Sequence, residues 1–150
     1  MVRGKFFIAT VIAFMALLVS SHVFAQAEVI EKRQDAMKGN AANAKAIKAA
    51  IEAKDYATIE TKAKDIMGTA EKIPSLFPKG STQGKTKATA AIWEKSDEFA
   101  KDAKNLSKAA NELVAAAKAK DDAEVGVKVK ALGEACGACH KAFRAEKYAE

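Results

Sequence analysis

The sequence is poor in several residue types, and each shortage restricts the fold. Its 150 residues include 8 Gly, 2 Pro, 2 Cys and 2 His, and aromatic residues make up 7% of the chain. So little Gly and Pro argues against a fibrous repeat or a disordered chain. Few aromatic residues beside plentiful Ala and Lys favour helices over strands, which nearly excludes an all-β fold.

Charge of one sign is not concentrated in any tail. The formal charge of +6 arises from 25 basic and 19 acidic residues that are intermixed along the chain. An intermixed surface of this kind does not indicate nucleic-acid binding.

Residues 1–25 have the organisation of a secretory signal peptide. Arg3 and Lys5 precede a nearly unbroken apolar run from Phe6 to Val19, and small residues follow up to Ala25. A retained anchor is disfavoured because about 14 apolar residues are fewer than the roughly 20 that span a bilayer. We expect cleavage after Ala25, with cleavage after residue 27 as the alternative.

Cleavage of the signal peptide changes the number of charged residues, histidines and methionines in the chain. The mature chain, residues 26–150, loses two of the 25 basic residues and none of the 19 acidic ones, so its formal charge is +4. It retains a single histidine, His140, and two methionines, Met37 and Met67. We expect a periplasmic protein without stable membrane insertion.

Apolar residues recur every three or four positions in four segments of the mature chain, which is the period of amphipathic helices. A loop over residues 74–89, rich in Pro, Gly, Ser and Thr, separates the second segment from the third, and Asp55 is placed to cap the second helix. The predicted inward-facing stripes are Ile30, Arg33, Met37, Asn40, Ala44, Ile47 and Ile51; Ile59, Ala63, Ile66, Ala70 and Ile73; Ile92, Ser96, Phe99, Ala103, Leu106, Ala110, Leu113 and Ala117; and Val125, Val129, Leu132, Cys136, Cys139 and Phe143.

Four helices with mostly short connections predict an all-α fold, an antiparallel up-down-up-down four-helix bundle over residues 26–150. Small inward-facing residues such as Ala44, Ala63, Ala103 and Ala110 provide less side-chain volume than leucines would. We therefore expect a bulky cofactor to share the interior of the bundle.

The last helix carries Cys136-Gly137-Ala138-Cys139-His140, the C-x-x-C-H pattern of c-type haem attachment. The two thiols reach the two vinyl groups of one porphyrin, and the adjoining histidine reaches the iron. At positions i, i+3 and i+4 of a helix the three side chains share one face. The sequence therefore predicts one covalent haem c with His140 as the proximal ligand.

Other uses of the cysteine pair fit less well. A thioredoxin-like redox pair belongs at a strand-to-helix junction, and the sequence shows no such pattern. A disulfide would close a very short loop and stabilise little. Zinc would need a further Cys or His ligand, and the mature chain has none to offer.

Few residues can ligate the opposite side of the iron. Because His140 is the only histidine of the mature chain, ligation by two histidines within one chain is excluded. Met37 is the better methionine, since it falls on a predicted inward stripe, and a thioether ligand would raise the reduction potential and suit electron transfer. The alternative is that Met37 only fills the distal pocket and leaves the iron five-coordinate.

Three further residues are candidates for the haem pocket. Arg33 lies one turn before Met37 and could bind a haem propionate, or extend to solvent at the edge of the bundle. Arg144, four residues after His140, would flank the proximal side or face solvent. Trp93 would pack on the porphyrin or on a neighbouring helix.

The chain resembles the class II c-type cytochromes, the cytochrome c′ and cytochrome c-556 group, over essentially the whole mature length. The resemblance rests on Arg33-Gln34-Asp35-Ala36-Met37-Lys38, Leu76-Phe77-Pro78-Lys79-Gly80-Ser81, Ile92-Trp93 and the stretch from Cys136 to Arg144. It implies a periplasmic four-helix bundle with one covalent haem c, a homodimer through the first two helices, and pocket roles for Arg33, Gln34 and Arg144. The residue matching Met37 ligates iron in the c-556 members and does not in the c′ members.

From these features we expect a one-electron carrier rather than an enzyme, with His140 and Met37 as axial ligands. Exposed lysines would attract a redox partner with an acidic docking surface. Two alternatives stay open: a five-coordinate haem protein that binds nitric oxide or carbon monoxide in a pocket lined by Met37, and a haem-free helical bundle that binds a partner.

Overall fold

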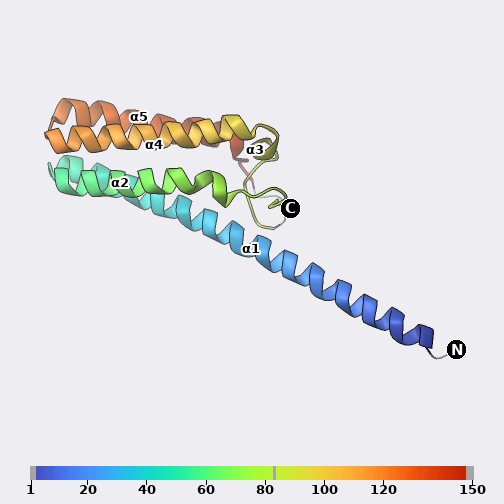
Figure 1. Ribbon diagram of the computed structural model, residues 1–150. Coiled ribbons are helices and arrows are strands. Elements are labelled where there is room, and N and C mark those ends of the chain that lie inside the picture. The colour runs from blue at the N-terminus through green and yellow to red at the C-terminus, as the bar shows by residue number, and fades with distance from the viewer. Residues whose placement is uncertain (1–2, 83, 148–150) are drawn as a thin grey trace.

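The computed structural model describes the backbone of residues 3–82 and 84–147 and the side chains of residues 26–82 and 84–147. The elements follow in the order α1 (Arg3–Glu52), α2 (Tyr56–Lys72), the 3₁₀ helix η1 (Ile73–Leu76), α3 (Ala91–Glu94), α4 (Ser96–Ala119) and α5 (Asp122–Phe143). Figure 1 shows α1, α2, α4 and α5 as the four long helices of a bundle, which confirms the predicted fold class.

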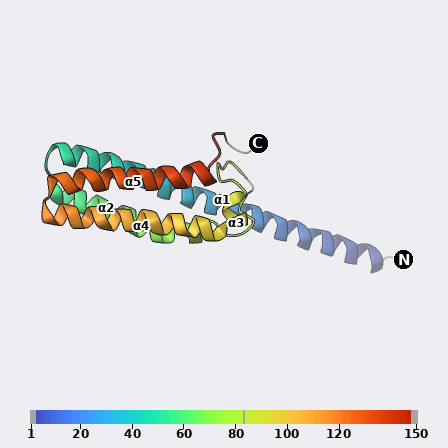
Figure 2. The same ribbon diagram turned by 90° about the horizontal axis from the view of Figure 1, so that it is seen from above.

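The four long helices form two layers with unequal contacts between them. Figure 1 shows α1 and α2 in one layer and α4 and α5 in the other, and Figure 2 shows α1 and α5 along the same side of the bundle. In the described chain α2 packs extensively on both α1 and α4, and α4 packs on α5, whereas α1 and α5 have almost no direct contact. The bundle is thus closed on the α2–α4 side and loosely joined on the α1–α5 side.

The core follows the predicted apolar stripes. The largest fully buried side chains include Ile47 of α1, Ile59 and Ile66 of α2, Leu113 of α4 and Val125 of α5. These residues belong to one hydrophobic cluster that runs through the bundle. Burying such side chains is the dominant favourable contribution to folding, so the stripes determine which face of each helix turns inward.

Both short turns of the bundle end in a residue that caps the next helix. The Asp55 carboxylate accepts a hydrogen bond from the backbone N–H of Thr58, which confirms the predicted cap of α2, and Asp121 accepts one from Glu124 at the start of α5. Each cap satisfies a backbone donor that the first turn of a helix leaves unpaired.

The predicted third helix differs from the observed one at its start. Instead of one helix beginning at Ile92, the chain forms the single turn α3, leaves helical geometry at Lys95 (φ −121°, ψ 48°) and begins α4 at Ser96. Ser96 is exposed rather than inward-facing, whereas Ile92 is buried. The break has a physical reason, because the indole N–H of Trp93 is held by backbone carbonyls of the preceding loop.

Within residues 26–82 and 84–147, no helix has the length and apolarity needed to cross a membrane. The predicted signal peptide, residues 1–25, lies outside the described side chains.

Candidate functional site

The cysteine pair lies near the end of α5, against the core. Cys136 and Cys139 are free thiols, half-buried and packed on the hydrophobic cluster, and His140 is the next residue on the same helix. Burial raises the pKa of the Cys136 thiol. Burial, together with the negative charge of Asp102, raises the pKa of Cys139 to about 11.

His140 stands at the edge of the site rather than within the core. The residue is exposed, yet neighbouring atoms remove part of its hydration, which lowers its pKa, and the positive charge of Arg144 lowers it further. A lowered pKa favours the neutral imidazole, which is the form that binds a metal.

Met37 lies on α1, half-buried and packed against the same core as the cysteines. The predicted proximal and distal residues therefore come from α5 and α1, the two long helices that barely contact each other. Met67 of α2 is also half-buried against the core, so a position near the core does not by itself distinguish the two methionines.

Arg33 is buried, with 3% of its surface exposed, so the alternative of a solvent-facing side chain is wrong. Its guanidinium donates hydrogen bonds to the Ser81 hydroxyl at 3.2 Å, the Ser81 carbonyl at 2.8 Å and the Thr86 hydroxyl at 3.1 Å. It also lies 4.8 Å from the ring centre of Phe77. Among the described residues no acid pairs with this buried charge, and burial alone lowers the pKa of Arg33.

Gln34 and Trp93 hold the same loop from two other directions. The Gln34 side-chain amide donates to the Lys85 carbonyl at 2.8 Å. The Trp93 indole N–H donates to the carbonyls of Phe77 and Pro78, both at 3.0 Å. The Trp93 ring packs against the core, and its indole N–H binds the loop, which is neither of the two partners predicted for it.

Arg144 joins the end of α5 to the loop through its backbone. Arg144 and Ala88 form an isolated antiparallel bridge, the Thr89 N–H donates to the Phe143 carbonyl at 3.1 Å, and the Ala145 N–H donates to the Lys87 carbonyl at 2.8 Å. The Arg144 side chain is exposed, beside His140 in the last turn.

Three phenylalanines, one from the loop and two from α4 and α5, pack together where the loop meets the helices. The ring of Phe99 on α4 lies edge-to-face with Phe77 at 5.0 Å and with Phe143 at 5.2 Å between ring centres. Such pairs add to the stabilisation from burial alone. The cluster fixes the end of α5, and with it the position of the cysteine pair.

The donor set and its surroundings fit haem c. Two thiols and an imidazole with the attachment spacing lie at one helix end, and the charge of the buried Arg33 has no acidic partner among the described residues, which suits an anionic group such as a propionate. Two buried polar atoms nearby in the fold, the Asn40 Oδ1 on α1 and the Thr89 Oγ1 after the loop, lack hydrogen-bond partners in the described chain. Orphaned atoms of this kind are rare unless another group or water satisfies them.

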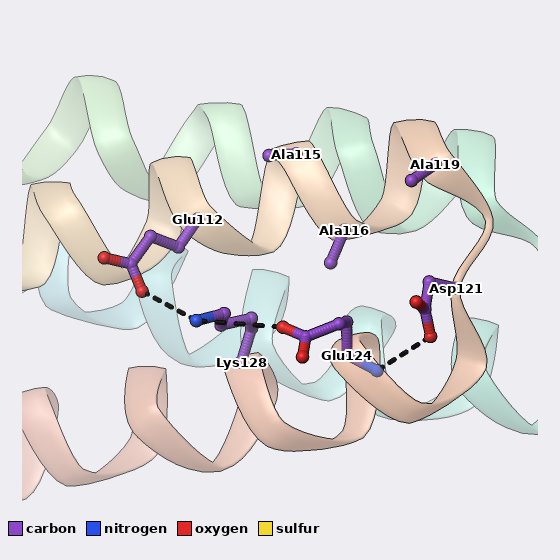
Figure 3. Close-up of a pocket in the computed structure, with 7 residues that line it drawn as sticks. All are labelled: Glu112, Ala115, Ala116, Ala119, Asp121, Glu124 and Lys128. Carbon is purple, nitrogen blue, oxygen red and sulfur yellow. Dashed lines mark hydrogen bonds and ion pairs between the residues drawn. The ribbon is translucent and has the colours of Figure 1, made fainter.

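A surface hollow lies at the opposite end of α4 and α5 and does not contain these residues. As Figure 3 shows, Lys128 lies between Glu112 and Glu124 there, beside three alanines of α4. The Lys128 ammonium is 3.2 Å from the Glu112 carboxylate and 3.8 Å from that of Glu124. Three acidic residues and one lysine line the hollow, and the third carboxylate, that of Asp121, accepts the backbone N–H of Glu124.

Sequence reasoning missed the loop residues that surround Arg33. Ser81 and Thr86 are buried polar residues, with 2% and 4% of their surfaces exposed. Both lie in a segment whose composition indicates only a loop, although Ser81 belongs to a stretch that carries the family resemblance. Phe77 carried a signal, since a lone aromatic residue in a polar segment often packs inward, but its partners could not be deduced.

Comparison with known proteins agrees with the geometry. The family model described as cytochrome C′ matches residues 28–144. The cytochrome c′ of Pararhodospirillum photometricum is 36% identical over 118 residues, covering 77% of this chain and 94% of that protein. A cytochrome c-556 of Agrobacterium tumefaciens strain II Chrys is 34% identical over 121 residues, covering 79% and 98%.

Solved structures show the same architecture. The crystal structure of cytochrome c′ from Thermochromatium tepidum superimposes with a TM-score of 0.74 at 29% identity, covering 81% of this chain and 97% of that one. A cytochrome c′ described as having an unusual ligand-controlled dimer dissociation gives a TM-score of 0.75 at 27% identity, with the same coverage. On these grounds the chain belongs to the cytochrome c′ family.

Proposed function

We propose that the chain is a periplasmic monohaem c-type cytochrome that carries one electron at a time. Haem c is attached through Cys136 and Cys139, and His140 and Met37 are the axial ligands of its iron. In this proposal the protein is an electron carrier and not an enzyme.

The observation that carries the proposal is the placement of the attachment residues. Cys136, Cys139 and His140 lie at the end of α5, the thiols pack against the core, and Met37 packs against that core from α1. The side on which α1 and α5 barely touch is where an inserted planar group displaces the fewest existing contacts.

When bound, the haem supplies a metal centre that gains and loses one electron. The protein's own residues determine how that centre is held. The two thiols would anchor the haem, and the neutral His140 imidazole and the Met37 thioether would bind its iron, where a thioether ligand raises the reduction potential. The buried guanidinium of Arg33 supplies positive charge for a propionate, and the loop that it holds shields that side from water.

The absorption spectrum of the purified protein tests the axial ligands. We expect a low-spin ferrous spectrum and a ferric charge-transfer band typical of methionine–iron ligation. Met37→Ala should convert the protein to high spin. Met67→Ala is the matched control, because Met67 is equally half-buried against the core and should leave the spectrum unchanged.

Two outcomes would contradict the ligand assignment. A wild-type protein that is already high spin, with bands that shift on addition of carbon monoxide, would instead support the five-coordinate, gas-binding alternative. Absence of haem from the protein after acid-acetone extraction and denaturation would refute covalent attachment.

Export and assembly have separate tests. The mass of the protein recovered from the periplasm should correspond to a chain beginning at Gln26, or at Glu28 for the alternative cleavage site. We also propose a homodimer through α1 and α2, supported by the dimeric relative described above. Sedimentation of the haem-loaded protein as a monomer at micromolar concentration would contradict the dimer.

A further inference from the structure

Positive charge gathers at one end of the molecule. Residues 77–90 contain three lysines, Lys79, Lys85 and Lys87, and no acidic residue, while residues 140–147 contain three basic residues against one acid, Glu146. The rest of residues 26–147 contains seventeen basic and seventeen acidic residues. The excess positive charge of this part of the chain therefore lies entirely in these two segments.

The two segments form one surface, which we call the basic cap (residues 77–82, 84–90 and 140–147). They are joined by the bridge between Ala88 and Arg144, by the hydrogen bond from the Ala145 N–H to the Lys87 carbonyl, and by the Lys87 ammonium on the Glu146 carbonyl at 2.7 Å. Arg33, Gln34 and Trp93 attach the loop to the helices beneath. The cap is thus a preformed surface rather than a loose loop.

The ion pairs of the protein lie elsewhere. Those found among the described residues join lysines to acids on the helices and on the turn between α1 and α2. Lys79, Lys141, Arg144 and Lys147 are exposed and take part in none of them. Basic side chains without an acidic partner are available to a negatively charged surface, and they speed the approach of such a partner.

The cap also contains His140, so a partner that docks here lies close to the proposed iron ligand. It offers no apolar anchor to a bilayer, since the exposed large hydrophobic residue of the described chain is Val127, near the start of α5 at the other end of that helix. We propose that the basic cap is the docking surface for a redox partner protein that presents acidic side chains. This inference rests on the function proposed above.

Small redox reagents of opposite charge test the sign of the surface where the electron leaves. The reduced holoprotein gives one electron to ferricyanide, which becomes ferrocyanide, or to the cation tris(phenanthroline)cobalt(III), which becomes the cobalt(II) complex. The cap variant is Lys79→Glu with Lys147→Glu, which leaves the proposed ligands intact. The control is Lys118→Glu with Lys120→Glu, two exposed residues at the end of α4 far from the cap and outside the helices of the proposed dimer, with the same change in net charge.

At low salt the cap variant should react with ferricyanide about tenfold more slowly and with the cobalt complex faster, whereas the control should change either rate by less than about twofold. Raising the ionic strength should remove the difference. Equal rates for the cap and control variants with both reagents would overturn the proposal.

A binding measurement identifies the class of partner without any electron transfer. The holoprotein is titrated with a short polyglutamate peptide and, separately, with vesicles of phosphatidylglycerol, followed by NMR shifts of its amides. We expect salt-sensitive peptide binding with shifts centred on the cap, lost in the cap variant and retained in the control. Vesicle binding without peptide binding, or peptide binding that the cap variant retains, would overturn the proposal.

The two proposals fail in different ways. A holoprotein with the expected spectrum whose cap variant behaves like the control refutes only the docking surface. A protein without covalent haem refutes the proposed function, and the docking surface with it.

Discussion

Replacing Arg33 by alanine tests how the loop over the site is held. The Arg33 guanidinium is buried and makes three hydrogen bonds to Ser81 and Thr86, which are 48 and 53 residues further along the chain. Among the described residues no other buried charged side chain connects α1 to this loop. Removing the guanidinium should therefore release the loop from the helices.

The expected loss follows from the atoms left behind. A buried acceptor without a donor costs about 1–3 kcal/mol, and the substitution strands up to three acceptors. Part of that cost is offset because the desolvated positive charge is removed as well. We expect Arg33→Ala to lower the free energy of unfolding by about 3 kcal/mol, and Arg33→Lys by about half as much, because an ammonium keeps the charge but cannot span all three acceptors.

The assay combines urea denaturation with amide hydrogen exchange of the haem-loaded protein. Exchange at the amides of Ser81 and Thr86, which donate to Pro78 and Gly84, should accelerate more than exchange in α4. Lys32→Ala is the control, because its exposed ion pair with Glu28 should leave the unfolding midpoint almost unchanged. A loss below about 1 kcal/mol with unchanged loop exchange would show that these hydrogen bonds do not hold the loop.

Three further outcomes can be checked on the same protein. Phe99→Ala should lower the free energy of unfolding in urea by about 3–5 kcal/mol, because Phe99 is buried between two other phenylalanine rings; the exposed Val127→Ala should have little effect, and equal effects would contradict the packing. In haem-free protein, Cys139, with its pKa raised to about 11, should react with iodoacetamide at pH 8 about tenfold more slowly than in the urea-unfolded chain, as followed by mass spectrometry, because the smaller thiolate fraction is partly offset by the higher nucleophilicity of each thiolate; equal rates would show that the thiol is not desolvated. The hydrogen bonds from Lys54 and Tyr56 lower the pKa of Asp122, so their contribution to stability is present above the unfolded pKa of about 4 and is lost as pH falls through the folded pKa. The urea midpoint should therefore fall with acidification less in Asp122→Asn than in wild type, and parallel curves would contradict this.

The helices were predictable because their determinants are local. The three-and-four spacing of apolar residues located each long helix, and the Asp55 cap could be assigned because an N-cap contacts a backbone N–H only three residues away. The placement of both cysteines against the core follows from the same periodicity.

The surroundings of Arg33 were not predictable, because they depend on contacts between distant parts of the chain. Its partners are separated from it by about fifty residues, and they lie in a loop whose path depends on contacts with α1, α3 and α5 together. The spacing of apolar residues along a helix carries no information about the path of such a loop. The break at Lys95 was missed similarly, because Ile92 continues the spacing of α4 although its own turn is oriented by the tryptophan beside it.

Three of the four small inward-facing alanines lie where two helices are in extensive contact. Alanines such as Ala63, Ala103 and Ala110 were expected to leave space for a cofactor inside the bundle. These three are buried on α2 and α4, the pair of helices with the most extensive contact, where small side chains allow two backbones to approach closely, whereas Ala44 is half-buried on α1. Space for a planar group is therefore to be sought on the α1–α5 side, where helix contact is sparse. The short side chains close one side of the bundle, and Met37 and the cysteine pair border the other.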